Sequence, residues 1–339
     1  MFFLFWRHIA IAYFTRKIGY LNKVSPFKYT LTGLGRQCII RYMSDYRRVS
    51  ILGVDVDLGY EIEDVTRILE NHLIENKSNY ICTTNPEFIM AAQKDTGFRD
   101  MINNASLSLP DGSGIVMADY YKRKMSTVCG SFFPKFISGL YYGAATVYSS
   151  FFKRSNFAPK ITGVAVSEKI FELCAAKGYS VFLLGGMVRD KKGKPIHNGE
   201  DIATIVAESI SKRYPKIKIV GSTSRFSYKP DDDISTIHYI KKCMEERGIE
   251  SVDFILVAYG QKKQESWMVR NLPKIPCKIG VGVGGTFDYL SGVSKKPSEI
   301  VIQNNLEWLH RLFTQPWRFT RIISAFPTFP FKVFISSLK

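Results

Sequence analysis

Asp111 is the residue whose type and position most clearly suggest chemistry. It lies in the segment Leu-Pro-Asp-Gly-Ser-Gly at 109–114, a turn between an apolar run and a predicted helix start. A second small, polar turn at 83–86 has the same setting shortly upstream. An ionised carboxylate is costly to desolvate unless it is paired or used, so an aspartate at a strand end is a functional candidate. If Asp111 faces a pocket, it is a candidate general base.

Five turns rich in small or polar residues follow predicted strands. Ligands bind at the carboxyl ends of the strands in open α/β sheets. Glycines there let the backbone approach a ligand closely, and helix N-termini offer N–H groups to phosphate. Together the turns predict a nucleotide-type ligand at one edge of one sheet. They lie at 83–86, 110–114, 185–186, 259–265 and 284–288.

The elements that must position these turns alternate along the chain. Short apolar runs alternate with amphipathic helical patterns, which predicts an α/β fold: a Rossmann-like, doubly wound, mostly parallel sheet with helices on both faces. The predicted strands are 49–54, 80–83, 105–109, 180–184, 217–220, 254–257 and 279–283. The predicted helices are 61–73, 86–94, 112–122, 167–177, 201–214, 234–247 and 263–271.

Charge and aromatic content divide the 339 residues into three parts. The net charge of +17 predicts anionic partners, namely nucleic acid, acidic lipid or phosphorylated substrates. No aromatic-bearing RNA motif is present and the basic residues flank the sheet, which disfavours nucleic acid. We predict a basic, aromatic extension (1–48), a Rossmann-like core (49–300) and a basic, aromatic C-terminal appendage (301–339).

No metal or cofactor site is predicted. The six cysteines and five histidines have none of the spacings typical of zinc sites, and the chain has neither a Walker A loop nor Gly-x-Gly-x-x-Gly in the first strand–helix turn. Asp55 and Asp57 imitate a metal-binding Asp-x-Asp motif but lie away from the five turns. Asp231 to Asp233 are better explained as a helix N-cap. No segment reaches the ~20 uninterrupted apolar residues of a spanning helix.

Seven blocks of sequence, in order, resemble the WecG/TagA/CpsF family of bacterial glycosyltransferases. The resemblance runs from about residue 50 to about residue 325. The blocks are Thr83-Thr84-Asn85-Pro86-Glu87, Pro110-Asp111-Gly112-Ser113-Gly114, Ile161-Thr162-Gly163, Phe182-Leu183-Leu184-Gly185-Gly186, Gln264-Glu265-x-Trp267, Gly282-Val283-Gly284-Gly285-Thr286-Phe287-Asp288 and Glu307-Trp308-Leu309-x-Arg311-Leu312.

The resemblance implies roles for residues in and near these blocks. Asp111 matches the family's catalytic carboxylate, which would deprotonate the acceptor hydroxyl, and Thr83 is the second residue of the catalytic set. Asp288 is also consistent with a cap on the following turn. The implied donor-binding set is Thr84, Asn85, Gly185, Gly186, Tyr259, Gln264, Gly284, Gly285 and Asp288. The implied set for the diphosphate and the acceptor is Lys160, Arg311, Arg318 and Arg321.

The resemblance also implies substrates, mechanism and location. Family members move an N-acetylmannosamine-type or related sugar from a UDP donor to a sugar on a polyprenyl diphosphate, with inversion and without a metal. No cofactor beyond the UDP-sugar is expected. Such an enzyme, acting in cell-surface polysaccharide synthesis, would be a peripheral protein on the cytoplasmic face of the bacterial inner membrane, in contact with anionic lipid. Whether it forms a homo-oligomer is open.

Departures from the family pattern leave the donor sugar open. Ala165 stands where an acidic residue is common, and Lys160 stands where an arginine is usual. UDP-glucose and a UDP-uronic acid are therefore alternatives, and a non-catalytic protein that binds anionic ligands is a more distant one. Residues 125–157 are interpreted as an insertion, either a membrane-dipping hairpin or amphipathic helix, or else a dimer contact. The aromatics among the arginines of the C-terminal tail suit a membrane surface, and a helix with ordinary core aromatics is the alternative.

Overall fold

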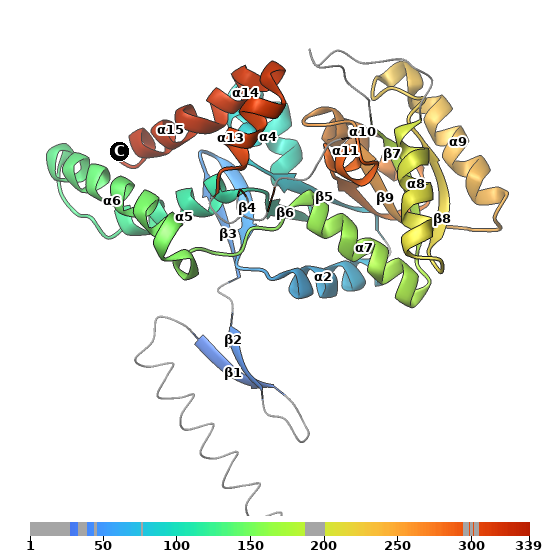
Figure 1. Cartoon of the computed structure of the whole chain (residues 1–339), viewed down its shortest axis with the longest axis horizontal. Helices are drawn as coiled ribbons and strands as arrows, with labels where there is room; N and C mark the ends of the chain where they lie inside the picture. The colour runs from blue at the N-terminus through green and yellow to red at the C-terminus, as the bar shows by residue number, and fades with distance from the viewer. Residues whose placement is uncertain are drawn as a thin grey trace, which may run out of the picture.

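Six parallel strands form the central sheet of the protein, in the order β6-β5-β10-β9-β7-β8 (Figure 1). The structure is a computed structural model that describes residues 28–32, 39–43, 46–75, 77–186, 201–293, 298, 301 and 305–339. The strands are β5 (Asn79–Thr84), β6 (Leu107–Pro110), β7 (Ser180–Gly185), β8 (Lys218–Thr223), β9 (Val252–Ala258) and β10 (Cys277–Gly282). They confirm the predicted α/β class and its parallel sheet.

Helices cover both faces of the sheet, as a parallel sheet with buried faces requires. Val65, Ile170 and Val206 pack with Leu183 and Leu256 on one face. The helices of this face are α2 (Ile62–Ile74), α7 (Gly163–Lys177), α8 (Ile202–Arg213) and α11 (Thr286–Leu290). The opposite face is covered by α9 (Asp233–Glu245), the 3₁₀ turn η3 (Leu272–Lys274) and α10 (Lys263–Asn271), whose Trp267 is fully buried.

The predicted first strand, 49–54, is wrong in its extent and its pairing. The chain instead forms an antiparallel hairpin of β3 (Arg47–Ile51) and β4 (Val54–Leu58), with β4 packed beside β6. The two turn residues, Leu52 and Gly53, have φ of 52° and 80°. Positive φ at both central positions defines the type I′ turn, whose twist matches that of paired strands, so the chain reverses in the middle of the apolar run.

The C-terminal helices pack against the core near α3 (Pro86–Ala92) and α5 (Ser113–Met125). Phe329 and Val333 of α15 (Phe329–Ser336) are buried in one cluster with Phe88 and Val116. Phe329 is only 1% exposed, whereas Phe331 is 62% exposed. The tail therefore has both interior and exterior aromatic residues. The other elements here are α4 (Thr96–Asn103), α13 (Glu307–Thr314), η4 (Pro316–Arg318), α14 (Phe319–Ile323) and the π-helical turn η5 (Ser324–Thr328).

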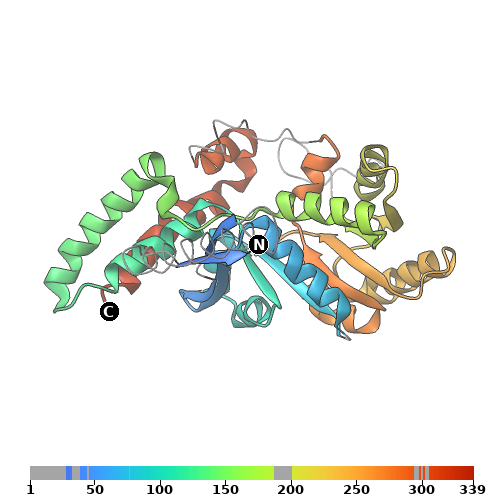
Figure 2. The same ribbon diagram turned by 90° about the horizontal axis from the view of Figure 1, so that it is seen from below.

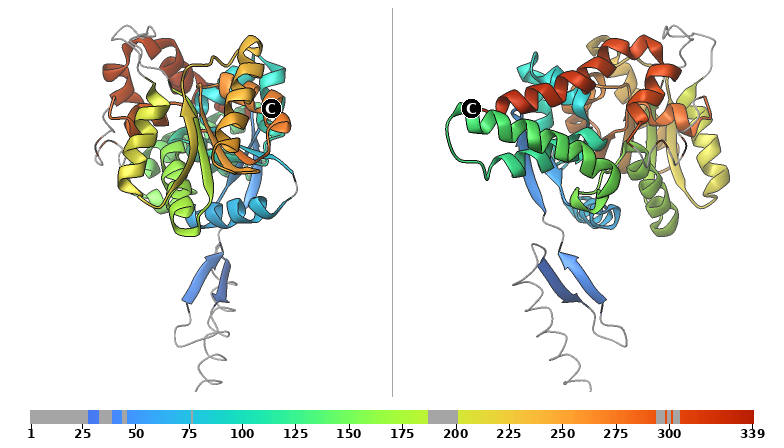
Figure 3. Two further views of the ribbon diagram at one scale, coloured as in Figure 1. Left: turned by 90° about the vertical axis from the view of Figure 1, so that its right-hand side faces the viewer. Right: turned by 60° about the vertical axis from the view of Figure 1, so that its left-hand side comes forward.

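The apolar stretch at 131–152 forms one helix, α6 (Phe132–Phe152), followed by the short turn η1 (Arg154–Asn156). α6 lies beside α5 and α15 at one end of the molecule (Figures 2 and 3). Among the residues that the structure describes, no helix is both long and apolar enough to cross a membrane. Most of the predicted 1–48 extension lies outside the described residues, apart from the antiparallel strands β1 (Lys28–Thr32) and β2 (Ile39–Met43) and residues 46–48.

Helix α7 begins four residues before the predicted start at Ser167. The reason is the cap: Thr162 accepts a hydrogen bond from the Ala165 N–H at 3.2 Å. A threonine cap satisfies one of the N–H groups that a helix start leaves unpaired. The earlier start brings Gly163 beside the sheet edge, where a Cβ would lie 3.1 Å from Thr286 Oγ1.

Candidate active site

The carboxyl ends of three neighbouring strands bring Asp111 together with the turns after β5 and β10. β6 pairs with β5, and β5 pairs with β10. The Asp111 N–H donates to the Thr84 carbonyl at 2.7 Å, which fixes the residue directly beyond β6. Gly112, with φ of 106°, then starts α5. This positive φ suits glycine and turns the chain so that Asp111 stands at the edge of the sheet.

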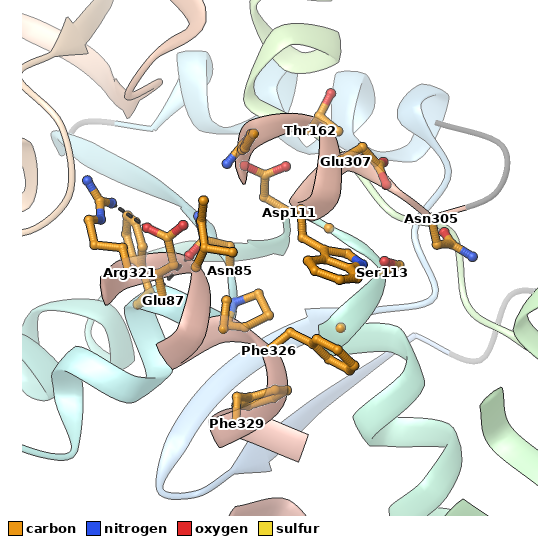
Figure 4. Close-up of a pocket in the computed structure, with 18 of the residues that line it drawn as sticks. Asn85, Glu87, Asp111, Ser113, Thr162, Asn305, Glu307, Arg321, Phe326 and Phe329 are labelled. Atoms are coloured by element: carbon orange, nitrogen blue, oxygen red, sulfur yellow. Dashed lines mark hydrogen bonds and ion pairs between the residues drawn. The ribbon is translucent and has the colours of Figure 1, made fainter. Parts of the chain in front are cut away.

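Asp111 lines a pocket of about 770 Å³ with its side chain half-buried. Within the described part of the chain, its carboxylate has no hydrogen bond or ion pair. Burial raises the pKa of Asp111 to about 6, against the opposing effects of the positive charges of Arg311 and Lys160. Glu307 and Glu87 raise that pKa further. Figure 4 shows Asp111 near Thr162 and Glu307 at one end of this space. A carboxylate with a pKa near neutral and no partner is suited to accept a proton.

Two arginines at the pocket have no acidic partner within hydrogen-bond or ion-pair distance among the described residues. Arg311 and Arg318 both line the pocket, and neither guanidinium forms a hydrogen bond or ion pair with any of the residues described. Burial lowers the pKa of Arg318, and the neighbouring charges of Arg321 and Arg311 lower it further. Three clustered guanidinium groups attract an anion, and arginine matches the geometry of phosphate oxygens.

Arg321 and Lys160 are each held by an acidic residue. Arg321 forms a salt bridge of 2.5 Å with Glu87, drawn as a dashed line in Figure 4, and donates to Gln261 at 2.6 Å. Lys160 forms an ion pair with Glu307. Arg321 lines the pocket. Lys160 does not line it, but the positive charge of Lys160 lowers the pKa of Asp111.

Gln264 ties two glycine turns together. Its side chain is fully buried, and its Oε1 accepts from the N–H groups of Gly260 at 3.2 Å and of Gly284 at 2.9 Å. A Cβ at Gly282 would lie 2.6 Å from Gln264 Nε2, so a larger residue there would displace the Gln264 carboxamide. Gln264, Gly284, Gly285 and Asp288 all line the pocket. The Gln264 carboxamide therefore fixes the positions of the two glycine turns that form this wall of the pocket.

The end of β5 and the turn after it each contribute a residue to the pocket. Thr83 lines it and donates its hydroxyl proton to the Gly282 carbonyl at 2.9 Å. Asn85 also lines it and accepts from the Phe88 N–H at 3.1 Å as the cap of α3. Thr84 is fully buried against Ser108, with 2.8 Å between the two hydroxyl oxygens, and does not line the pocket.

Three of the expected donor-binding residues lie apart from this pocket. Gly185 ends β7 and Gly186 follows it, and β7 is separated from β5 by β10 and β9. Tyr259 packs against Gly185, where a Cβ would lie 2.9 Å from the ring. None of the three is among the residues that line the pocket. The structure thus gathers the turns after β5, β6 and β10, and the turn after β9 contributes Gly260, Gln261 and Gln264 in place of Tyr259.

Sequence reasoning assigned no role to three polar residues at the site. Glu87 and Glu307 lie in recognised blocks, but only the partners that they hold, Arg321 and Lys160, were singled out. Gln261 joins the site by donating to the Glu87 carbonyl at 3.0 Å. The signal for both glutamates was their place in the first turn of a helix, where an acidic side chain is favourable.

The two acidic runs have structural partners. Asp57 accepts from the Ser108 N–H at 2.7 Å and lies 3.6 Å from Arg48. Asp233 lies in the first turn of α9 and binds both Arg270 and Asn271. In the part of the chain that the structure describes, no group of three or more His, Cys, Asp or Glu side chains has the arrangement of a metal site.

Comparison with known proteins assigns the chain to a family. The family model described as "Glycosyl transferase WecG/TagA/CpsF family" matches residues 49–131 and 140–339. The unmatched stretch inside this span, 132–139, is shorter than the insertion expected at 125–157.

Two curated relatives carry the same name, N-acetylglucosaminyldiphosphoundecaprenol N-acetyl-beta-D-mannosaminyltransferase. The protein of Bacillus subtilis (strain 168) is 27% identical over 257 residues, 76% of this chain and 80% of its own length. The protein of Staphylococcus aureus (strain MRSA252) is 22% identical over 291 residues, 86% of this chain and 93% of its own length. With the family model matching most of its residues, the chain belongs to the WecG/TagA/CpsF family of glycosyltransferases.

Proposed function

We propose that the protein transfers an N-acetylmannosamine-type sugar from a UDP donor to an N-acetylglucosamine carried on a polyprenyl diphosphate. The relatives' shared name supports the N-acetylmannosaminyl group that is transferred and the lipid-linked N-acetylglucosamine that accepts it. The observation that carries the proposal is one pocket that contains the Asp111 carboxylate together with Arg311 and Arg318, all three without an ion-pair partner among the described residues. A base and an anion site within one pocket are what glycosyl transfer from a nucleoside diphosphate requires.

In the proposed reaction, Asp111 accepts the proton of the acceptor hydroxyl. The hydroxyl oxygen forms a bond to the anomeric carbon of the donor while the bond from that carbon to the diphosphate oxygen breaks. One displacement inverts the configuration at this carbon. Asp111 acts as a base only when ionised, and the charge of Arg311 favours the ionised form by lowering the pKa.

The leaving UDP carries the negative charge that develops in the reaction. Arg318 and Arg311 are placed to stabilise it, since both line the pocket and neither guanidinium forms an ion pair with a described residue. The loop of Gly284 and Gly285, held by Gln264, provides backbone that a nucleotide can approach. We propose that these groups supply the positive charge and that no metal is needed.

We propose that the enzyme works as a peripheral protein at the cytoplasmic face of the membrane. Large apolar side chains are exposed along α6, including Phe133 at 70% and Phe152 at 71%, and Phe331 is exposed on the neighbouring α15. Aromatic residues with basic neighbours bind the headgroup region of anionic bilayers. The net charge of +17 acts in the same direction.

The test is transfer by the purified protein to N-acetylglucosaminyl-diphospho-undecaprenol. We expect product from the UDP sugar of N-acetylmannosamine, identified by the mass of the lipid and by release of UDP. UDP-N-acetylglucosamine, UDP-glucose and a UDP-uronic acid complete the donor panel. Efficient use of one of these alone would replace the donor in the proposal, and transfer from none of the four would refute the proposal.

A further inference from the structure

The pocket that contains Asp111 extends well beyond the polar groups. Its second half is apolar and lies between α5, α6 and α15. We call this half the apolar arm and define it by the lining residues Met117, Gly143, Val147, Phe151, Val333 and Phe334. Figure 4 shows Asp111 and Glu307 at one end of the space and Phe326 and Phe329 toward the other. A ligand that fills the whole pocket must therefore be polar at one end and apolar at the other.

The walls of the apolar arm are fixed by packing between the helices. The rings of Phe136 and Phe334 meet edge to face with 5.8 Å between their centroids. The hydroxyl oxygens of Tyr121 and Ser337 lie 2.9 Å apart, which ties α5 to the end of α15. These contacts span the two walls without filling the space between them.

Small residues on α6 keep the arm open and apolar. Gly143 lines the pocket, and a Cβ there would meet no atom within 4 Å. Thr146 and Ser150 also line the pocket, but their hydroxyls donate to the helix carbonyls of Tyr142 and Val147 at 2.7 Å. With these polar groups satisfied inside the helix, the surface toward the arm is hydrocarbon.

The outer surface of the same helices suits a bilayer. Leu140, Tyr141 and Tyr148 of α6 are more than half exposed, and Ile335 on α15 is exposed too. Soluble proteins rarely expose so many large apolar side chains on adjoining elements without an apolar partner. The arm is thus bordered by surface that can rest in the region where a membrane lipid emerges.

We propose that the apolar arm binds the first isoprene units of the acceptor's polyprenyl chain. This inference rests on the proposed function and adds a site for the lipid itself. The chemistry of the two ends of the pocket supports it: Asp111 and Glu307 lie at one end and hydrocarbon lines the other, which match the sugar and the polyprenyl chain of one acceptor. α6 supplies one wall, and its first residues, 132–139, are those that the family model does not match.

The test uses short acceptors in solution without membranes, so that partition into a bilayer has no part in the result. N-acetylglucosaminyl diphosphate is esterified either with methyl or with geranyl, which has two isoprene units. For the unaltered protein we expect the KM for the geranyl ester to be roughly tenfold or more below that for the methyl ester.

The variant Gly143→Leu places a side chain inside the arm, and Ala144→Leu adds the same side chain on the exposed side of the same helix. We expect Gly143→Leu to abolish the advantage of the geranyl ester while UDP binding by calorimetry stays unchanged. Ala144→Leu should keep the advantage. Gly143→Ala should lose part of the advantage of the geranyl ester. Because alanine favours the helix, a loss in this variant cannot be ascribed to misfolding.

The outcomes separate this inference from the proposed function. Equal KM values for the two esters in the unaltered protein would overturn the inference that the apolar arm binds isoprene units, and would leave the transferase proposal intact. Retention of the geranyl advantage by a folded Gly143→Leu protein would also overturn it. Transfer to neither ester nor to the undecaprenyl acceptor would refute both proposals together.

Discussion

The Arg321 guanidinium lies 2.5 Å from the Glu87 carboxylate and joins α14 to the first turn of α3. The same guanidinium donates to Gln261, whose amide donates back to the Glu87 carbonyl. Glu87 is buried, so its charge depends on this partner. The cluster thereby fixes the C-terminal helices beside the pocket, and it separates the role of Arg321 from that of Arg318.

Arg321→Ala is expected to lower the free energy of unfolding by about 1–3 kcal/mol, because it leaves the buried Glu87 carboxylate without its charged partner. Chemical denaturation at pH 7 measures this. Arg318→Ala is the matched control, since Arg318 has no acidic partner among the described residues, and it should change stability little. Equal losses from both variants would contradict the distinction. Arg318→Ala should instead raise the KM for the UDP-sugar donor. The increase should be larger at low ionic strength, because salt screens the lost charge less there.

Asp111→Asn is expected to reduce kcat by roughly 10²–10⁴-fold while the protein remains folded, because an amide cannot accept the acceptor's proton. Steady-state transfer assays measure the loss, and calorimetry with UDP checks that the donor site is intact. Asp100→Asn, on an exposed face of α4, is the control for removing one carboxylate. Turnover by Asp111→Asn at near-normal rate would exclude Asp111 as the base.

The pH dependence of transfer should report the ionisation of Asp111. Its raised pKa of about 6 predicts that kcat/KM rises with pH and levels off above about pH 7, since only the ionised form accepts a proton. Arg311→Gln removes a positive charge that lowers this pKa, so the rise should move to higher pH in addition to any loss of rate. An unmoved rise in Arg311→Gln would show that another group titrates.

Much of the fold could be predicted because its elements follow short-range rules. β7 contains the apolar run 181–184 and β9 the apolar run 254–258, and burial on both faces makes such runs continuous. The hairpin of β3 and β4 was not predicted because its turn contains Leu52, and leucine is not a residue type that indicates a positive φ. A local pattern cannot show which way the chain folds back when the turn lacks the usual residues.

The site was predictable where the sheet alone positions it. Asp111, Asn85 and Gly284 follow neighbouring strands and Thr83 lies near the end of one, so topology brings them together. The partners of the arginines were not predictable, because the Arg321–Glu87 bridge joins residues far apart in the chain. The apolar arm depends on how α6 packs on α15, which sequence periodicity does not specify.

Membrane binding should depend on the exposed aromatic residues of α6. Phe133→Ser combined with Phe152→Ser should weaken binding to vesicles of anionic phosphatidylglycerol by roughly tenfold or more. Each substitution removes an exposed ring, and with it the apolar area that the bilayer would bury. Vesicle sedimentation measures the change. Ile234→Ser removes an exposed apolar residue from α9 and should leave binding unchanged. Unaltered vesicle binding by the double variant would exclude this face of α6.

Glu265 offers a test of the buried region behind the pocket. Its side chain is fully buried on α10, its Oε1 accepts from Gln264 Nε2 at 2.8 Å, and its Oε2 has no hydrogen-bond partner among the described residues. Burial raises the pKa of Glu265 to about 7. The folded protein therefore holds a proton that the unfolded chain releases near its ordinary pKa of about 4.5.

The contribution of protonated Glu265 to the free energy of unfolding is consequently present at pH 4.5 and is lost as the pH rises through about 7. Glu265→Gln keeps an oxygen for Gln264 and removes the ionisation, so it should be more stable than the unaltered protein at pH 8 by roughly 3 kcal/mol and about equal to it at pH 4.5. Denaturation of both proteins across this range measures the difference. Glu250→Gln, at an exposed position, should follow the unaltered protein. A difference that stays constant with pH would mean that Glu265 is already ionised in the fold and that a charge is buried directly behind Gln264.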